Sequence, residues 1–402
     1  MRRYTYKAKD KKTGRTISGS VQAESEHAAG RILIEQGYVP QKVTEESKGG
    51  FFAKLSNRVT GKQRIIFTRQ LATLIGAGLP LSMALRMVAE QTEDKPTKAM
   101  TEDVLAQVEG GKTLHEAFSK YPDVFNQVYL ALVAAGETSG TLDVSMQRLA
   151  TQQEKDANMI AKIRGAMTYP AIVLFVIVVV IIFMMVAVVP QVENLYRDLS
   201  EPLPTMTQIL VNMSNFVMNF WWLILVLIAI VVWFLAQFRK TDVGKKWFAT
   251  FKLNVPLFKG LFLRLYNARF ARTMQMLLSA GVPMLEAMAI SARAMNNIVV
   301  EQQIAEAIAM VRSGKPLSVA LKGRDYILPL LPQMSATGEQ SGKIDEMLGK
   351  AAQVYEDELD ERIAALSTMI EPILMVALAL VAAGIVGAVL FPIYALVNKI
   401  ST

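Results

Sequence analysis

The chain has 402 residues, of which 52% are hydrophobic and only 19% carry a charge. This balance is too apolar for an ordinary soluble protein and indicates membrane-spanning segments. The lack of cysteine excludes disulfide bonds and cysteine-ligated metal sites, and the net charge of +8 comes without the interleaved aromatic and basic motifs of nucleic-acid-binding proteins.

The first predicted part of the chain is a small α+β module at residues 1–46. Short strands with alternating side-chain character are expected at residues 4–8, 17–23 and 39–43. A helix is expected over residues 25–36, where Ser25 is placed to cap it and Gly37 to end it. A glycine-containing linker is expected over residues 47–61.

The sequence pattern over residues 62–169 predicts a cytoplasmic bundle of six helices. Glycine and proline breaks separate the first five helices, which are expected at residues 64–75, 80–90, 97–108, 113–119 and 124–135. The sixth helix begins near Leu142 and meets no strong breaker before the first apolar segment. If it continues to Val189 it is about 70 Å long at ~1.5 Å per residue, and it would carry motion from the cytoplasm into the bilayer.

Three long apolar segments match the ~30 Å hydrocarbon core of a bilayer. They are expected to span the membrane at residues 170–190, 216–238 and 372–397. Lysine and arginine are concentrated after the second span and scarce in residues 191–215, which predicts a short extracytoplasmic loop there. The N-terminus and both large polar regions are then cytoplasmic, and the C-terminus is extracytoplasmic.

The sequence repeats itself at a spacing of about two hundred residues, far longer than the ~20–50 residues of solenoid repeats. Matching positions are Phe67 and Phe270, Gly78 and Gly281, Lys112 and Lys315, Pro170 and Pro372, and Pro190 and Pro392. Residues 239–371 therefore predict a second bundle. We expect an all-α membrane protein with two homologous six-helix cytoplasmic bundles, three transmembrane helices and the small α+β N-terminal module.

One signature of glycine, glutamate and serine occurs in each copy. Its residues are Gly136, Glu137, Ser139 and Gly140 in the first copy, and Gly338, Glu339, Ser341 and Gly342 in the second. We expect a fixed turn after a helix that ends at Gly136, with Ser139 satisfying free helix N–H groups and Asp143 in the first turn of the next helix. Glu137 and Glu339 have three possible roles: a solvated carboxylate, a contact to a partner, or a weak cation ligand with Asp143 or Asp345.

Other motifs fail on residue type or spacing. Gly111-Lys112-Thr113 lacks the glycine that a phosphate-binding loop requires five positions earlier, where residue 106 is alanine. The serine of the repeated signature is in the fourth place, not the third place of a nucleophile elbow. His27 and His115 have no ligand-spaced neighbour. We predict no catalytic, cofactor-binding or metal-ligating residues, and no enzymatic activity.

Each copy meets the membrane at a proline, which follows Tyr169 in the first copy and Glu371 in the second. Pro170 and Pro372 either kink a continuous helix or mark the junction of two helices. A carboxylate at the edge of the hydrocarbon is costly unless it is hydrated or paired. Glu371 is therefore expected either at headgroup level or paired with a basic residue of another helix or subunit.

Three features resemble the type II secretion F / type IV pilus inner-membrane platform family. They are the Gly-x-Pro turns at residues 78–80 and 281–283, the two Gly-Glu-x-Ser-Gly signatures, and the Met-Thr-Tyr-Pro and Met-Ile-Glu-Pro segments at 167–170 and 369–372. With the N-terminal module, the resemblance extends over nearly the whole chain. It implies a non-enzymatic platform in the bacterial cytoplasmic (inner) membrane. The resemblance does not distinguish among platforms of pili, competence pseudopili and secretion pseudopili.

The resemblance also implies partners. The cytoplasmic domains would engage a hexameric assembly ATPase, and the spans would move pilin or pseudopilin subunits from the lipid bilayer into a filament. Inner-membrane alignment proteins and further copies of the chain, in a homo-oligomer, would complete the platform. Candidate cytoplasmic contacts, which a positive-inside anchor explains nearly as well, are Arg239, Lys240, Lys245 and Lys246.

A subunit of a membrane transporter is the alternative function. Transporters also carry duplicated halves, but they place polar or broken helices at mid-membrane, and these spans show almost none.

Overall fold

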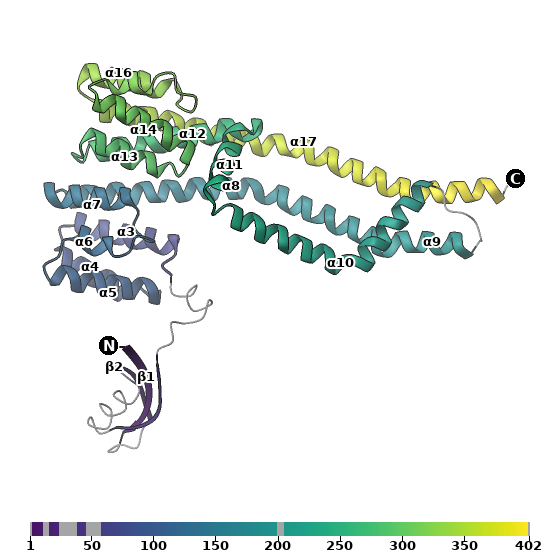
Figure 1. Ribbon diagram of the computed structural model, residues 1–402, viewed down its shortest axis with the longest axis horizontal. Helices are drawn as coiled ribbons and strands as arrows, with labels where there is room; N and C mark the ends of the chain where they lie inside the picture. The colour runs from purple at the N-terminus through teal and green to yellow at the C-terminus, as the bar shows by residue number, and fades with distance from the viewer. Residues whose placement is uncertain (1, 11–15, 24–37, 46–57, 199–204, 401–402) are drawn as a thin grey trace. The chain divides into compact units, whose positions relative to one another are not determined.

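The computed structural model describes residues 2–10, 16–23, 38–45, 58–198 and 205–400 (Figure 1). The chain forms two compact units, Met1–Thr113 and Leu114–Thr402, and each is described by itself. The first unit begins with β1 (Arg2–Asp10), β2 (Thr16–Ala23) and β3 (Tyr38–Glu45), an antiparallel sheet in the order β2-β1-β3. These strands occupy the predicted segments, whereas the predicted helix at 25–36 and most of the linker lie outside the described residues.

Three helices follow in the first unit: α3 (Gly61–Gly76), α4 (Leu81–Gln91) and α5 (Lys95–Glu109). The carboxylate of Asp94 caps α5 by accepting a hydrogen bond from the Thr97 N–H at 3.0 Å. Gly78 joins α3 to α4 with a φ of 85°, a conformation that favours glycine. The apolar faces of these helices supply the buried side chains Phe67, Leu71, Leu85, Val88 and Val104.

The second unit starts with α6 (Leu114–Ser119), α7 (Gln127–Ser139) and α8 (Leu142–Phe183). Phe125 packs between Phe118 and Tyr129, with ring centroids 4.2 Å and 4.7 Å away. α6 packs on α7 and α7 on α8. This aromatic cluster anchors the short helix α6, which is too short to be stable by itself.

The second copy of the duplicated sequence forms six helices in the same order, preceded by the additional helix α11 (Asp242–Asn254). The six helices are α12 (Pro256–Leu278), α13 (Met284–Ala294), α14 (Ile298–Arg312), α15 (Leu317–Leu321), α16 (Leu330–Ser341) and α17 (Ile344–Ile400). α12 packs along α17 and against α13, and α16 packs against α15 and α17. The first copy is divided between the two units, so its packing as a separate six-helix bundle stays a prediction.

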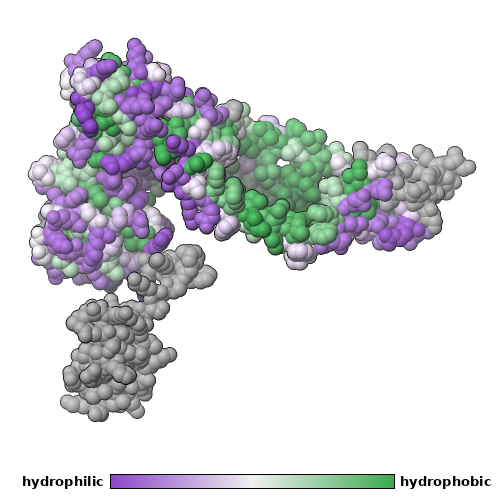
Figure 2. Space-filling model, in the orientation of Figure 1, coloured by the Kyte–Doolittle hydropathy of each residue, from purple (hydrophilic) through white to green (hydrophobic). Residues whose placement is uncertain are grey.

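Three described helical segments are long and apolar enough to cross a membrane: Leu142–Asp198, Thr207–Phe238 and Ile344–Gly384. The first combines α8 with the π-helix η1 (Met184–Val188) and α9 (Val189–Asp198), and the second lies within α10 (Thr205–Phe238). Figure 2 shows hydrophobic surface along this part of the molecule and hydrophilic surface over the helices of the second copy. The predicted continuation of the sixth helix from Leu142 through the first span is confirmed, with a π-helical turn within it.

The described residues of the predicted extracytoplasmic loop over residues 191–215 are helical, and the placement of this segment outside the cytoplasm stays a prediction. Helix continues to Asp198 and resumes at Thr205. Proline loses its N–H and its ring clashes with the carbonyl four residues earlier, which for Pro190 is Val186. Val186 lies within η1, so the wider turn accommodates Pro190 and the helix continues to Asp198.

Candidate functional site

The Gly-Glu-x-Ser-Gly signature closes a helix in each copy. α7 runs through Gly136 and ends at Gly140, whose φ of 71° lies in the left-handed region. α16 ends in the same way at Gly342, with a φ of 72°. The prediction that the helix ends at Gly136 is therefore wrong by one helical turn.

Gly136 and Gly338 are required by helix packing and not by a turn. A Cβ atom at Gly136 would lie 2.7 Å from the Ser145 Oγ atom and 3.1 Å from the Leu142 Cα atom in α8. A Cβ atom at Gly338 would lie 2.6 Å from the Ile344 Cα atom in α17. The two glycines thus let the last turn of one helix contact the first turn of the next.

Glu137 and Glu339 each bind the start of the short helix in their own copy. The Glu137 carboxylate accepts hydrogen bonds from the N–H groups of Leu114, at 2.5 Å, and His115, at 2.9 Å. The Glu339 carboxylate accepts from the Leu317 N–H and, at 2.5 Å, from the Ser318 hydroxyl. A carboxylate is favoured there because the first N–H groups of a helix lack partners and carry partial positive charge.

This contact joins two sequence motifs that looked independent. Leu114 and Leu317 belong to the repeated Gly-Lys-x-Leu segment, and the glutamates belong to the repeated Gly-Glu-x-Ser-Gly segment. In both copies the described contacts of the carboxylate are to the chain's own backbone and hydroxyl groups. Among the described residues no group of three or more His, Cys, Asp and Glu could hold a metal ion.

The repeated serines do not cap the following helix. The Ser139 hydroxyl donates to the Ala135 carbonyl at 2.7 Å and bonds the Thr141 hydroxyl. The Ser341 hydroxyl donates to the Thr337 carbonyl at 2.8 Å. The prediction that Ser139 satisfies free N–H groups is wrong because its own helix continues past Gly136, which leaves the hydroxyl beside the carbonyl four residues earlier. Asp143 does lie in the first turn of α8, as predicted.

α8 and α17 are joined by ion pairs that precede the predicted spans in both helices. Lys162 Nζ lies 2.6 Å from Asp360 Oδ2, and Lys155 Nζ lies 3.4 Å from Glu356 Oε2. Arg272 in α12 makes a two-pronged contact with the same Glu356, with both N–O distances at 2.8 Å. Arg272 and Glu356 are only 15% and 14% exposed, so this contact loses less to solvent screening than the Lys162 pair.

An apolar cluster lies beside these ion pairs. Leu261, Leu359 and Ile363 are buried in it. Its partly buried members come from α8, α12 and α17: Met159, Ile163, Ala166, Leu265 and Leu366. Burial of such side chains contributes roughly 1.5–3 kcal/mol each, more than an exposed ion pair provides. Partly buried side chains of α8 thus pack on buried side chains of α12 and α17, which adds an apolar contact to the ion pairs between the two long helices.

Tyr355 connects α17 to the start of α16. Its hydroxyl donates to the Leu328 carbonyl at 3.2 Å and accepts from the Leu331 N–H at 3.1 Å. Burial raises the pKa of Tyr355 well above its ordinary value, and this residue lies well before Pro372, outside the predicted span. The tyrosine thus fixes the second copy onto the helix that continues into the membrane.

The prolines at the membrane boundary lie inside continuous helices. Pro170 is buried within α8, and Pro372 lies within α17. Neither proline marks the junction of two separate helices. Tyr169 is 57% exposed, and Glu371 is exposed and forms no ion pair with the described residues. The pairing of Glu371 with another subunit stays a prediction.

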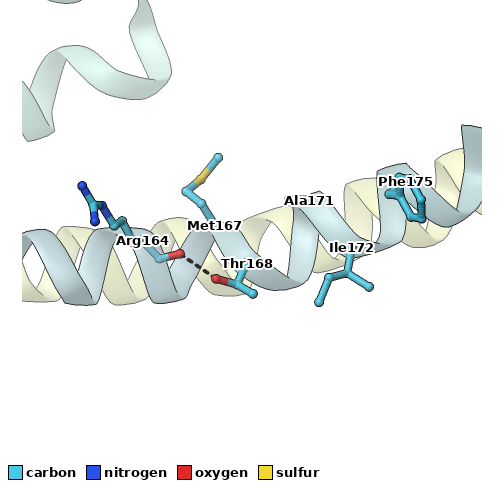
Figure 3. A pocket seen from close by; sticks show the side chains of 6 residues that line it. All are labelled: Arg164, Met167, Thr168, Ala171, Ile172 and Phe175. Atoms are coloured by element: carbon cyan, nitrogen blue, oxygen red, sulfur yellow. Dashed lines mark hydrogen bonds between the residues drawn. The ribbon is translucent and has the colours of Figure 1, made fainter. Parts of the chain in front are cut away.

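An open groove of about 440 Å³ follows α8 across this boundary. It is lined by Arg164, Met167, Thr168, Ala171, Ile172 and Phe175. Figure 3 shows these side chains along successive turns, with the Thr168 hydroxyl donating to the Arg164 carbonyl at 2.9 Å. The lining is almost wholly apolar, with the Arg164 guanidinium at the end before the predicted span.

The candidate cytoplasmic contacts Arg239, Lys240, Lys245 and Lys246 lie between the end of α10 and the first turns of α11. All four are exposed. The Arg239 guanidinium lies 5.2 Å from the centroid of the Phe248 ring, and Lys245 Nζ lies 3.1 Å from Asp242 Oδ1. Sequence reasoning did not identify the aromatic side chains that accompany this basic stretch.

Comparison with known proteins matches nearly the whole chain. The family model for type II secretion system protein F matches residues 67–190 and 270–392, and the model for its N-terminal domain matches residues 1–44. The two matched ranges are the two copies of the duplicated sequence.

Named relatives include both pilus and secretion proteins. The chain is 35% identical to the type IV pilus assembly protein PilC of Thermus thermophilus, over 99% of each chain. It is 34% identical to PilC of Myxococcus xanthus, over 97% of this chain and 94% of the relative. It is 33% identical to the type II secretion system protein F of Vibrio cholerae, over the full length of both chains.

Proposed function

Because the chain belongs to the type II secretion system protein F family, we propose that it is the inner-membrane platform of a type IV pilus or type II secretion machine. In this role it couples a cytoplasmic assembly ATPase to the movement of pilin subunits from the bilayer into the filament. The N-terminus and the helices of both copies face the cytoplasm, and the C-terminus is extracytoplasmic, as the distribution of lysine and arginine indicates.

The observation that carries the proposal is the continuity of two long helices. α8 and α17 each begin in the helices of the duplicated region and continue into an apolar span. α17 has 57 residues, which corresponds to about 85 Å at ~1.5 Å per residue. A displacement at the cytoplasmic end of such a helix reaches the membrane without crossing a flexible connection.

The contacts between α8 and α17 make the two helices move together. The Lys162–Asp360 pair and the apolar cluster around Leu359 lie just before the predicted spans. A force applied to either copy would therefore reach the first and the third span, into which α8 and α17 continue. The pilin subunits would contact the apolar side chains that the spans expose, and the ATPase would contact the cytoplasmic helices.

Co-purification and filament assembly test the proposal together. Full-length chain is purified in mild detergent from cells that express the assembly ATPase of the same organism, and filaments or secreted product are measured in a strain that lacks the chain. We expect the ATPase to co-purify with the chain. We also expect assembly to be lost in the strain that lacks the chain. A variant without residues 1–46 shows whether the predicted N-terminal module contributes to ATPase binding.

Normal assembly in the strain that lacks the chain would contradict the proposal. Flux of a solute through vesicles that contain the purified chain, without any ATPase, would instead favour the transporter alternative.

A further inference from the structure

α11 has one buried face and one exposed face. The buried face packs against other helices of the second copy. Gly244, Ala249 and Leu253 are buried, and the helix packs against α12 and α14. The Asn297 side chain before α14 donates to the Ala249 carbonyl at 3.5 Å. One side of α11 is thus part of the second copy.

The other face carries an apolar stripe that the described residues leave exposed. Val243, Trp247 and Phe251 are spaced four residues apart, which places them on one side of a helix. Their exposed fractions are 71%, 52% and 52%, and the rings of Trp247 and Phe251 stack with centroids 5.2 Å apart. Exposed aromatic side chains in such a row mark a surface that binds another phase or partner.

The stripe is continuous with the second predicted span. Phe234 stacks on Phe238 at the end of α10, and Phe238 contacts Trp247 with ring centroids 6.4 Å apart. Phe234 is 60% exposed on the apolar surface of that span. The lipid-facing surface of α10 therefore leads directly onto the stripe of α11.

The turn between the two helices fixes the direction of α11. The Thr241 hydroxyl accepts from the Gly244 N–H at 3.1 Å and donates to the Phe238 carbonyl at 2.7 Å. A Cβ atom at Gly244 would lie 1.8 Å from that carbonyl oxygen, so this close approach requires glycine. Figure 1 shows α11 turned across the direction of α10, as a helix lying along a membrane surface would be.

The charges beside the stripe suit an anionic surface. Arg239, Lys240, Lys245 and Lys246 are exposed, and Asp242 is the only acidic residue from Arg239 to Asn254. Basic residues near a cytoplasmic leaflet gain about 1 kcal/mol each from anionic lipids.

We propose that α11 is an amphipathic helix that lies in the cytoplasmic lipid–water interface and binds anionic phospholipid. Val243, Trp247 and Phe251 enter the boundary between headgroups and acyl chains, and the basic side chains contact the phosphates. The bilayer surface, and not a protein partner, is the occupant because the stripe continues the lipid-facing surface of α10 without interruption. The second copy then has a fixed depth and orientation against the membrane.

Site-directed spin labelling tests this proposal on the full-length chain, which contains no native cysteine. Single variants V243C and F251C carry a nitroxide and are reconstituted in nanodiscs that contain phosphatidylglycerol. V319C in α15, where the native valine is 49% exposed, is the matched control. We expect the labels at 243 and 251 to be several-fold more accessible to oxygen than to a water-soluble nickel chelate, with the label at 319 showing the opposite preference.

The charge contribution is tested by lipid composition and by the variant K240Q/K246Q. Replacement of phosphatidylglycerol by phosphatidylcholine, or of these lysines by glutamine, is expected to lower the oxygen preference at 243 and 251 and to leave the label at 319 unchanged. Labels at 243 and 251 that favour the nickel chelate, or that are shielded from both reagents, would overturn the proposal, since they would show water or protein over the stripe. Size-exclusion and circular dichroism profiles identical to those of the unlabelled chain establish that each variant is folded.

Discussion

Glu137 and Glu339 show how a repeated residue can be recognised in the sequence while its contact stays hidden. The repeat identifies both positions, but each carboxylate binds N–H groups more than twenty residues earlier in the chain. Only the packing of the short helix against its neighbour brings these groups together. The recurrence of the Gly-Lys-x-Leu segment in register with the glutamate was the one available signal.

Loss of a glutamate cap should destabilise its own copy. E339A leaves the first N–H groups of α15 without an acceptor, and hydrogen bonds to charged groups contribute about 1.5–3 kcal/mol. We expect a lower melting temperature for E339A and E137A in detergent, measured by scanning fluorimetry. E346A is the matched control, because Glu346 is exposed and pairs with Lys343 on neighbouring turns. Equal melting temperatures for E339A and E346A would show that the cap contributes nothing.

Gly338 should tolerate no side chain. A Cβ atom there would lie 2.6 Å from the backbone of Ile344, and such overpacking costs about 1–3 kcal/mol. G338A should therefore lower the melting temperature. At the exposed Gly165 no atom lies within 4 Å of an added Cβ, and alanine is favoured over glycine inside a helix. G165A should leave stability unchanged or raise it, and a similar effect of both substitutions would contradict the packing role of Gly338.

Tyr355 gives the second copy a pH dependence at alkaline pH. Burial raises the pKa of its hydroxyl, so the folded chain keeps the proton where an unfolded tyrosine, with a pKa of about 10, loses it. The contribution of this hydroxyl is fully present below pH ~10 and is lost as the pH rises further. Melting temperatures from pH 8 to 11 should fall more steeply for the native chain than for Y355F. Parallel curves would contradict this assignment.

At the scale of the elements, the sequence identifies the long helices and misjudges one connection. The run from Leu142 into the first span follows from the lack of a breaker, and it is a continuous helix through Pro170. The charge distribution that predicts the loop over 191–215 does not show that its described residues continue the helix past Pro190. A π-helical turn accommodates this proline, and the Ser214 hydroxyl donates to the Met185 carbonyl within that turn. Periodicity carries no information on such a local adjustment.

The joint between α8 and α17 is the element-scale claim that cross-linking can test. Because the chain has no native cysteine, K162C/D360C can be treated with a short bis-maleimide in membranes. The native side chains meet at 2.6 Å, so we expect efficient intramolecular cross-linking, read as a mobility shift on denaturing gels. K162C/D345C is the control, since residue 345 lies about 22 Å further along α17 at ~1.5 Å per residue. Equal cross-linking of both pairs would show that the joint is not formed.

In the whole molecule, the duplicated sequence forms helices in the same order in both copies but continues into different apolar segments. The first copy continues through α8, η1 and α9 into α10, whereas the second copy continues through α17 alone. The fold class and the three spans could be predicted because composition and periodicity report on them directly. Contacts between residues far apart in the chain, such as those of Arg272 and Lys155 with Glu356, could not, since nothing in the sequence pairs such residues.

The central claim is that α8 and α17 transmit force from the cytoplasm to the spans. A flexible Gly-Ser-Gly-Ser insertion after Met167, with a matched insertion after Met369, interrupts both helices just before Pro170 and Pro372 while leaving the Lys162–Asp360 joint in place. The same insertion after Lys48, in the predicted linker, is the control. Filament assembly, or secretion, is measured in the strain that lacks the native chain. We expect normal ATPase co-purification and no assembly for the double insertion, with assembly retained in the control. Normal assembly with both helices interrupted would show that α8 and α17 do not transmit the force.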